Sequence, residues 1–146
     1  MQCILRLYQG FIHTMQALSP AMMLALRLWI AHIFWASGIL KASNWDNTLE
    51  LFMYEHPVTF LPTAVAAFLD TTFEICSPIL LALGLATRLA TLPLIAMTLV
   101  INFTYLESDE HYYWLMILGT LLCNGAGRFS LDALIKKKYY ASSSDI

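Results

Sequence analysis

The fold of this chain is decided by residues 70–88, which read DTTFEICSPILLALGLATR. They close an apolar run that begins near residue 60 and is long enough to cross the hydrocarbon core of a bilayer. Asp70 and Glu74 lie near its middle, where a charged side chain costs ~2.5–3.5 kcal/mol on insertion scales. Because they are one helical turn apart, both acids lie on the same face of a helix. The stretch therefore predicts a membrane-spanning helix whose polar face lines a pocket within a bundle.

The composition of the chain is that of a membrane protein. Of its 146 residues, 59% are hydrophobic and 12% are charged, whereas soluble domains carry about 25% charged residues. The length leaves room for one bundle, so we expect a single membrane domain over residues 1–146. We expect the lipid bilayer as the main partner and no nucleic acid.

The predicted fold is all-α: a four-transmembrane-helix bundle with an N-terminal interfacial amphipathic helix and a short basic C-terminal helix. The four predicted spans are residues 21–41, 60–84, 89–106 and 110–126. Residues 2–18 have an amphipathic pattern typical of a helix lying in the headgroup plane. Ser19 and Pro20 then predict the start of the first span, because serine caps helices and proline is tolerated in their first turn. The basic tail helix is predicted over residues 131–140.

The connecting segments predict the orientation. Residues 43–57 are partly apolar and should form a short helix on the membrane surface. With four spans, both termini share one side, and that side carries most of the cations: Arg6, Arg88, Arg128, Lys136, Lys137 and Lys138. The positive-inside rule therefore predicts that both termini are cytoplasmic. By the same rule, the three lysines are orientation signals rather than a binding patch.

The buried polar residues are the candidates for chemistry. The candidate pocket residues are Arg27, His32, Lys41, Asp70 and Glu74. Depths estimated from the helical rise put Arg27 within reach of Glu74, so we predict that these two residues pair. The alternative is that the pair only locks two spans together, that His32 is an ordinary interior histidine, and that Lys41 extends to the outer surface.

Two further observations bear on the site. The third span has its own polar stripe, which includes Thr98 and Asn102, while Lys41 and His111 both lie near the outer boundary, where they could meet. The three cysteines are scattered and show no C-x-x-C spacing, and the histidines show no H-x-x-E-H spacing. We therefore expect neither a thiol–disulfide relay nor a metal site.

Three motifs together resemble the DoxX family of small bacterial membrane proteins. They are Arg27…Ser37-Gly38…Lys41; Glu74…Leu83-Gly84-Leu85…Thr87-Arg88; and the run GAGRFSLD over residues 125–132. The residues that match the family pattern are Arg27, Gly38, Lys41, Glu74, Gly84, Arg88, Gly127, Arg128 and Asp132. Ala126 departs from it, since a proline is usual between the two glycines. The resemblance implies a four-span protein of the bacterial cytoplasmic (inner) membrane.

The same resemblance implies a function, because the family is related to a subunit of a thiosulfate:quinone oxidoreductase and some relatives associate with oxidative-stress partners. The first hypothesis is a membrane subunit or accessory of a quinone-linked redox system. Its quinone would lie between the first two spans, held by Arg27, His32 and Glu74. No haem or flavin signature is present, so the chain is at most one subunit of an oxidoreductase. The electrons would then come from a redox partner protein.

Two other functions fit the sequence. One is a non-enzymatic scaffold or assembly factor, which recruits a partner protein or a second copy through the surface segment or the basic tail. The other is a small-molecule or proton pathway along Asp70 and Glu74, and it ranks lowest because no inverted repeat is evident.

Overall fold

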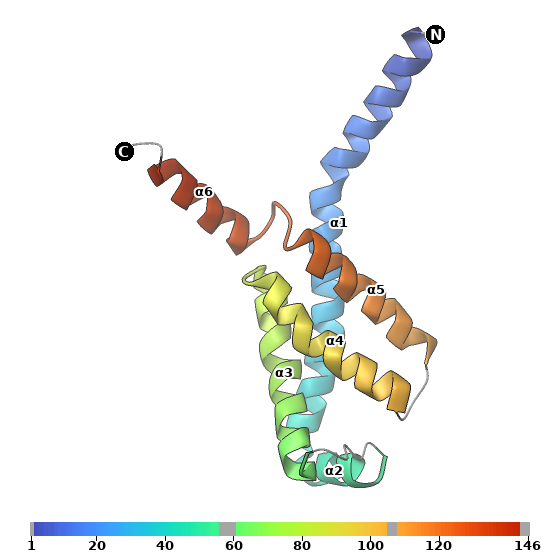
Figure 1. The fold of residues 1–146 in the computed structure, drawn as a ribbon, viewed down its shortest axis with the longest axis vertical. Helices are drawn as coiled ribbons and strands as arrows, with labels where there is room; N and C mark the ends of the chain where they lie inside the picture. Colours follow the sequence, from blue (N-terminus) through green and yellow to red (C-terminus); the bar gives the residue numbers. More distant parts are fainter. Residues whose placement is uncertain (1, 56–60, 105–107, 144–146) are drawn as a thin grey trace.

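The computed structural model describes residues 2–55, 61–104 and 108–143, and this part of the chain is helical with no strand. The all-α prediction is therefore confirmed. The elements in chain order are α1 (Gln2–Ser43), α2 (Trp45–Glu50), the π-helical turn η1 (Leu51–Glu55), α3 (Thr63–Leu83), α4 (Thr87–Thr104), α5 (Asp109–Asn124) and α6 (Leu131–Ser143) (Figure 1).

By length and composition, two of the described helices are long and apolar enough to cross a membrane. They are residues 6–43 of α1 and the whole of α3. Residues 87–103 of α4 form a shorter apolar helix. A short helix predicted between the first two spans is present as α2 and η1, and its location on the membrane surface stays a prediction. Residues 56–60 lie outside the described part.

The predicted boundary at Ser19 and Pro20 is wrong. Residues 2–18 are helical, but they continue without a break into the first predicted span, and Pro20 lies inside α1. A proline removes one hydrogen bond of a helix, yet good helix formers such as Ala17 and Ala21 flank it and favour continuation. The first third of α1 extends beyond the other helices (Figure 1), and the side chains of residues 6–11 are exposed. No packing therefore bends the chain at the proline, and a separate interfacial helix does not form.

Two helix caps fix the end of α3 and the start of α4. Helix α3 ends at Gly84, which has a φ of +67° and is therefore in the left-handed conformation that glycine tolerates best. Helix α4 begins two residues earlier than predicted because the carboxylate of Asp132 accepts the backbone N–H groups of Ala86 (2.9 Å) and Thr87 (3.3 Å). The cap comes from 45 residues further along the chain, so local sequence gave no sign of it.

The core lies where α1, α3, α4 and α5 meet. Its buried apolar side chains are Ile30, Ala31, Phe34, Leu81, Ala90, Leu94, Leu118 and Leu121. Helices α1 and α3 approach closely at Gly38, where an added Cβ would lie 3.0 Å from backbone and side-chain carbons of Glu74. A second small core of Phe52, Ala66 and Ala67 attaches η1 to α3. These contacts hold the polar residues of α1 and α3 against one another.

Candidate functional site

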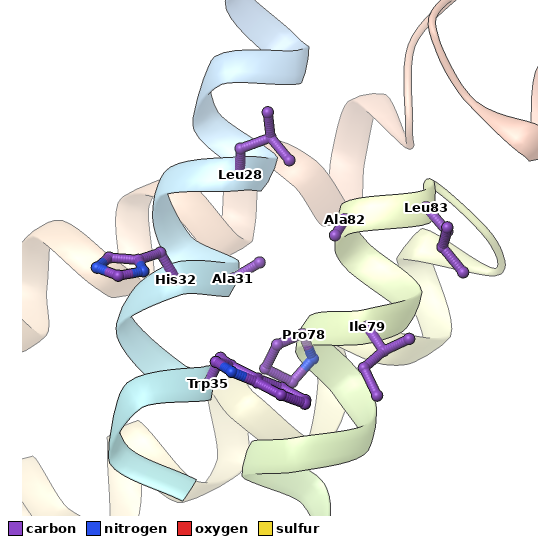
Figure 2. A pocket seen from close by; sticks show the side chains of 8 residues that line it. All are labelled: Leu28, Ala31, His32, Trp35, Pro78, Ile79, Ala82 and Leu83. Carbon is purple, nitrogen blue, oxygen red and sulfur yellow. The ribbon is translucent and has the colours of Figure 1, made fainter. Parts of the chain in front are cut away.

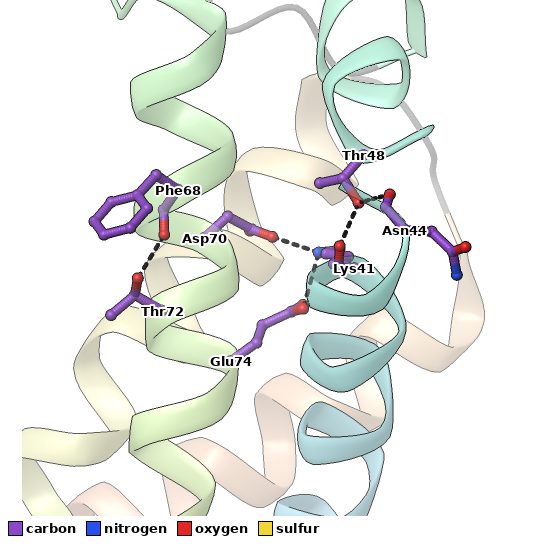
Figure 3. A network of polar contacts seen from close by, with 7 residues as sticks. All are labelled: Lys41, Asn44, Thr48, Phe68, Asp70, Thr72 and Glu74. Carbon is purple, nitrogen blue, oxygen red and sulfur yellow. Dashed lines mark hydrogen bonds and ion pairs between the residues drawn. The ribbon is translucent and has the colours of Figure 1, made fainter. Parts of the chain in front are cut away.

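A cluster of one cation and two carboxylates lies between α1 and α3 (Figure 3). The Nζ atom of Lys41 donates a hydrogen bond to Asp70 and lies 2.9 Å from Oε2 of Glu74. The side chains of Lys41, Asp70 and Glu74 are only 14%, 8% and 5% exposed. The prediction that Asp70 and Glu74 share a face is confirmed, since one ammonium contacts both. Lys41 does not extend to the surface, so the alternative reading of this residue is wrong.

Helix α2 and η1 cover the outer end of this cluster. Thr48 of α2 is buried, and its hydroxyl donates to the backbone carbonyls of Lys41 (2.9 Å) and Asn44 (3.1 Å). The ring centroid of Phe52 in η1 lies 5.7 Å from Lys41 Nζ, within the range of a cation–π contact. The surface segment is thus packed onto the cluster, and Lys41 has an aromatic ring as well as two carboxylates around it.

Beside the cluster is a cavity of about 200 Å³. Residues from α1, η1, α3, α4 and α5 line it: Phe34, Ser37, Lys41, Leu51, Glu74, Met97, Thr98, Ile101, His111 and Trp114. One part of the wall is charged or polar, and another is aromatic, with the rings of Phe34 and Trp114 in a T-shaped contact at 5.6 Å. Such a mixture of apolar walls and a few convergent polar groups is typical of ligand pockets.

His111 is held in place on the far wall from α3. Its Nδ1 lies 3.2 Å from Oδ1 of Asn102, and its ring makes a T-shaped contact with Trp114 at 5.1 Å. The same Oδ1 accepts the backbone N–H of Ser108, which marks it as an acceptor. Nδ1 of His111 therefore donates its N–H to Oδ1 of Asn102, and this bond orients the ring.

The predicted pair of Arg27 with Glu74 is wrong. Arg27 is 1% exposed and donates from Nη2 to the backbone carbonyl of Phe129. Its Nη1 would lie 1.8 Å from a Cβ added to Gly84, so the guanidinium packs against the end of α3, two to three turns from Glu74. Arg27 therefore connects α1 to the α3–α4 turn and to the segment before α6.

His32 also lies apart from the cluster. It is exposed and lines an apolar groove of about 340 Å³ between α1 and α3. Figure 2 shows Ala31 and Trp35 of α1 on one side of this groove and Pro78 and Ile79 of α3 on the other. The sequence hypothesis put His32 and Glu74 in one pocket, whereas in the structure His32 lines the groove and Glu74 lines the cavity.

The glycine, arginine and aspartate motifs have structural roles that the contacts explain. Gly38 permits the α1–α3 approach, and Gly84 makes room for Arg27. Arg88 donates from Nη2 to the carbonyl of Cys123 at 3.1 Å, which connects α4 to the end of α5. Asp132 caps α4. Gly127 has a φ of +76°, and Arg128 is exposed beside it.

The site has residues that were not among the predicted pocket residues. Ser37, Thr98 and His111 line the cavity, and Asn102 positions His111. Thr98 and Asn102 belong to the polar stripe visible in the sequence of the third span. The polar stripe was the feature of the sequence that could have indicated these two residues. Only the packing of α4 against α5 shows that the stripe faces the interior of the bundle.

Comparisons with known proteins agree with the resemblance seen in the sequence. Residues 22–106 match the DoxX family. An uncharacterised protein of Haemophilus influenzae is 29% identical over 140 residues, which cover 86% of this chain and 90% of that protein. No solved structure gives a significant match. The family match spans more than half of the chain and includes Arg27, Lys41, Asp70 and Glu74, so the chain belongs to the DoxX family of membrane proteins.

Proposed function

We propose that this DoxX protein is a membrane subunit or accessory of a quinone-linked redox system and that the cavity beside Lys41 holds the quinone ring. One observation carries the proposal: Lys41, Glu74 and His111 line the same cavity as the aromatic pair of Phe34 and Trp114. A quinone carbonyl needs a hydrogen-bond donor, and the ammonium of Lys41 has three N–H groups, of which Asp70 and Glu74 engage two. The aromatic side chains offer flat apolar surfaces for the ring.

The size of the cavity limits the ligand. Pockets for drug-sized molecules measure about 300–1,000 Å³, whereas this one measures about 200 Å³. It suits a single substituted ring, with any isoprenoid tail left in the bilayer. Reduction of a quinone to a quinol consumes two electrons and two protons. The acids and the histidine are the groups suited to exchanging protons, and the electrons are assigned to a partner chain because the sequence has no haem or flavin signature.

The proposal includes a topology in which α4 and α5 also cross the membrane, with both termini in the cytoplasm of a bacterial cell. Support comes from the packing of α4 and α5 against the two long apolar helices and from the cations near the termini. Helix α5 has 16 residues, which is about 24 Å, so the bilayer must be thin beside it. Two fusions to a reporter that is active only in the cytoplasm test this topology. The reporter should be active when it is fused after residue 146 and inactive when it is inserted within α2.

The ligand test compares matched variants purified in a mild detergent. Quinone extracted from the wild-type protein should be present at a near-stoichiometric amount, and it should be lost in Glu74→Gln. Glu50→Gln, which changes an exposed acid of α2, is the control and should retain it. The variant His32→Ala tests which of the two pockets holds the quinone, because His32 lines the groove and is not among the residues that line the cavity. Loss of quinone in His32→Ala but not in Glu74→Gln would show that the quinone binds in the groove and not in the cavity. Absence of quinone from the wild type would contradict the proposal.

A further inference from the structure

The first part of α1 projects past the other helices (Figure 1). Helix α3 has 21 residues, a length of about 32 Å, which matches the ~30 Å hydrocarbon core of a bilayer. Its end at Gly84 packs against Arg27 of α1. Residues 4–15 therefore lie roughly 12–35 Å past the end of α3, whereas the headgroup layer is only about 5–8 Å thick. This part of α1 extends out of the bilayer, and lipid does not cover it.

Large apolar side chains form an exposed stripe along this part of α1. They recur at alternating intervals of four and three residues, and each is 44–72% exposed: Ile4, Tyr8, Phe11, Met15, Leu18 and Met22. At 100° per residue, all six fall within about 40° of one line along the helix. The polar residues Gln9, His13 and Gln16 lie on the opposite side. Alternating intervals of four and three residues are the seam pattern of a coiled coil.

The stripe faces away from the bundle. Gln16 and Met23 of α1 line a cavity together with Gly127 and Arg128, so this side of α1 faces the segment that follows α5. The stripe lies about 110° around the helix from that side. Further along α1 the same line reaches Trp29, which is 64% exposed. A second helix can therefore pack along the stripe without meeting the rest of the chain.

The chemistry and size of the stripe indicate its partner. Arg6 is the only Asp, Glu, Lys or Arg in residues 4–22, and it lies on the opposite side of the helix, so the stripe offers no charge to an acidic or basic partner. Six large apolar side chains bury on the order of 500 Å² per copy, so two copies reach about 1,000 Å², the size at which specific interfaces begin. A second copy in the same membrane presents the same stripe, in the same orientation and at the same height.

We propose that residues 4–22 of two copies pair as a parallel two-stranded coiled coil outside the bilayer, with identical residues meeting across a twofold axis. Such an interface is self-complementary, because each stripe packs against its own copy. The pairing gives the exposed stripe the cover that neither the bundle nor the lipid provides. The proposal is independent of the quinone, because it uses neither the cavity beside Lys41 nor any residue that lines it.

The test measures the dissociation constant of the dimer by sedimentation equilibrium of the full chain in a mild detergent. Phe11→Glu places two like charges opposite each other and should weaken the dimer more than about tenfold. His13→Glu adds the same charge to an exposed position on the opposite side and should change the constant by less than about twofold. Mixing Phe11→Glu with Phe11→Lys should restore a dimer that contains one chain of each kind, because residue 11 meets residue 11.

Disulfide crosslinking in membranes tests the same pairing without detergent. In a chain whose native cysteines are replaced by alanine, Met15→Cys should give a covalent dimer under mild oxidation. Gln16→Cys should not, because residue 16 lies away from the seam and its two copies are too far apart for a disulfide.

Three results would overturn the proposal. The first is a wild-type chain that is monomeric in detergent and a Met15→Cys chain that does not crosslink in membranes. The second is equal weakening by Phe11→Glu and His13→Glu, which would exclude the stripe as the contact. The third is equal crosslinking at residues 15 and 16, which would show random collision. Thermal unfolding controls for folding, and Phe11→Glu should leave it unchanged because Phe11 is 61% exposed.

Discussion

The Nζ atom of Lys41 lies 2.9 Å from Oε2 of Glu74, across the interface of α1 and α3, and the same ammonium bonds Asp70. A single cation is thus shared by two acids on successive turns of one helix. Because all three side chains are largely buried, water screens the attraction between them less than in a surface pair, and removing one partner leaves a buried charge without its counter-ion. The cluster connects the two longest apolar helices of the described chain and forms one wall of the proposed quinone cavity.

Lys41→Met should destabilise the protein by about 3–5 kcal/mol, because it leaves two buried carboxylates without their cation. Lys41→Arg keeps the charge and should lose less. The measurement is unfolding by denaturant in detergent micelles. In the double variant of Lys41→Met with Asp70→Asn, the total loss should be smaller than the sum of the single losses. Additive losses would show that the two side chains do not interact.

Gly38→Ala should separate α1 from α3, because the new Cβ would lie 3.0 Å from atoms of Glu74 and Ile75. The expected loss of stability is about 1–3 kcal/mol, the usual cost of overpacking. Gly119→Ala is the control, since no atom lies within 4 Å of a Cβ there. That change should be neutral or stabilise α5 by up to about 1 kcal/mol, because alanine favours helices more than glycine does. Equal losses at both positions would contradict close packing at Gly38.

Gly84→Ala should destabilise the protein by more than the roughly 1–2 kcal/mol that an alanine costs in the left-handed conformation of Gly84 (φ +67°, ψ +38°). The reason is that the new Cβ would also collide with Arg27 and Ser130, at 1.8 and 2.6 Å. Truncating Arg27 removes the shorter of these contacts, so in the double variant of Arg27→Ala with Gly84→Ala the total loss of unfolding free energy should be smaller than the sum of the single losses. Additive losses would show that Arg27 moves aside without loss.

Asp132→Ala should destabilise the start of α4, although residue 132 belongs to α6. Loss of a helix cap costs about 0.5–2 kcal/mol, and hydrogen exchange at the amides of Ala86 and Thr87 should become faster. Ser130→Ala is the control, because the Ser130 hydroxyl has local partners: it accepts from the N–H of Ala133 at 3.1 Å and donates to the carbonyl of Gly127 at 2.7 Å. Unchanged exchange at residues 86 and 87 in Asp132→Ala would contradict the cap.

Much of the fold could be predicted from the sequence because helix formation is local. Apolar stretches bounded by turn residues gave the positions of α3, α4 and α5 to within a few residues, and the basic segment that follows them gave the position of α6. The helical repeat placed Asp70 and Glu74 on one face, and the structure confirms it. The break expected at Pro20 failed, because a proline alone does not redirect a helix whose flanking residues favour continuation.

The partners within the site could not be predicted, because they depend on how far one helix is shifted along another. Arg27 and Lys41 share a face of α1, so the sequence offered both as cations for the acids. The close approach of Gly38 to Glu74 sets the register of the antiparallel pair. Lys41, one turn beyond Gly38, then meets Asp70 and Glu74, while Arg27 lies level with Gly84 at the other end of α3.

The sequence by itself thus determined the helices, their apolar character and which residues share a face, since each follows from neighbouring residues in the chain. Only the tertiary structure decided that Lys41 rather than Arg27 neutralises the acids, that His111 joins their cavity and that Asp132 caps α4. The physical reason is that contacts between distant segments depend on the register and the depth at which helices pack. One close approach at a glycine, such as that of Gly38 to Glu74, is enough to change both the register and the depth.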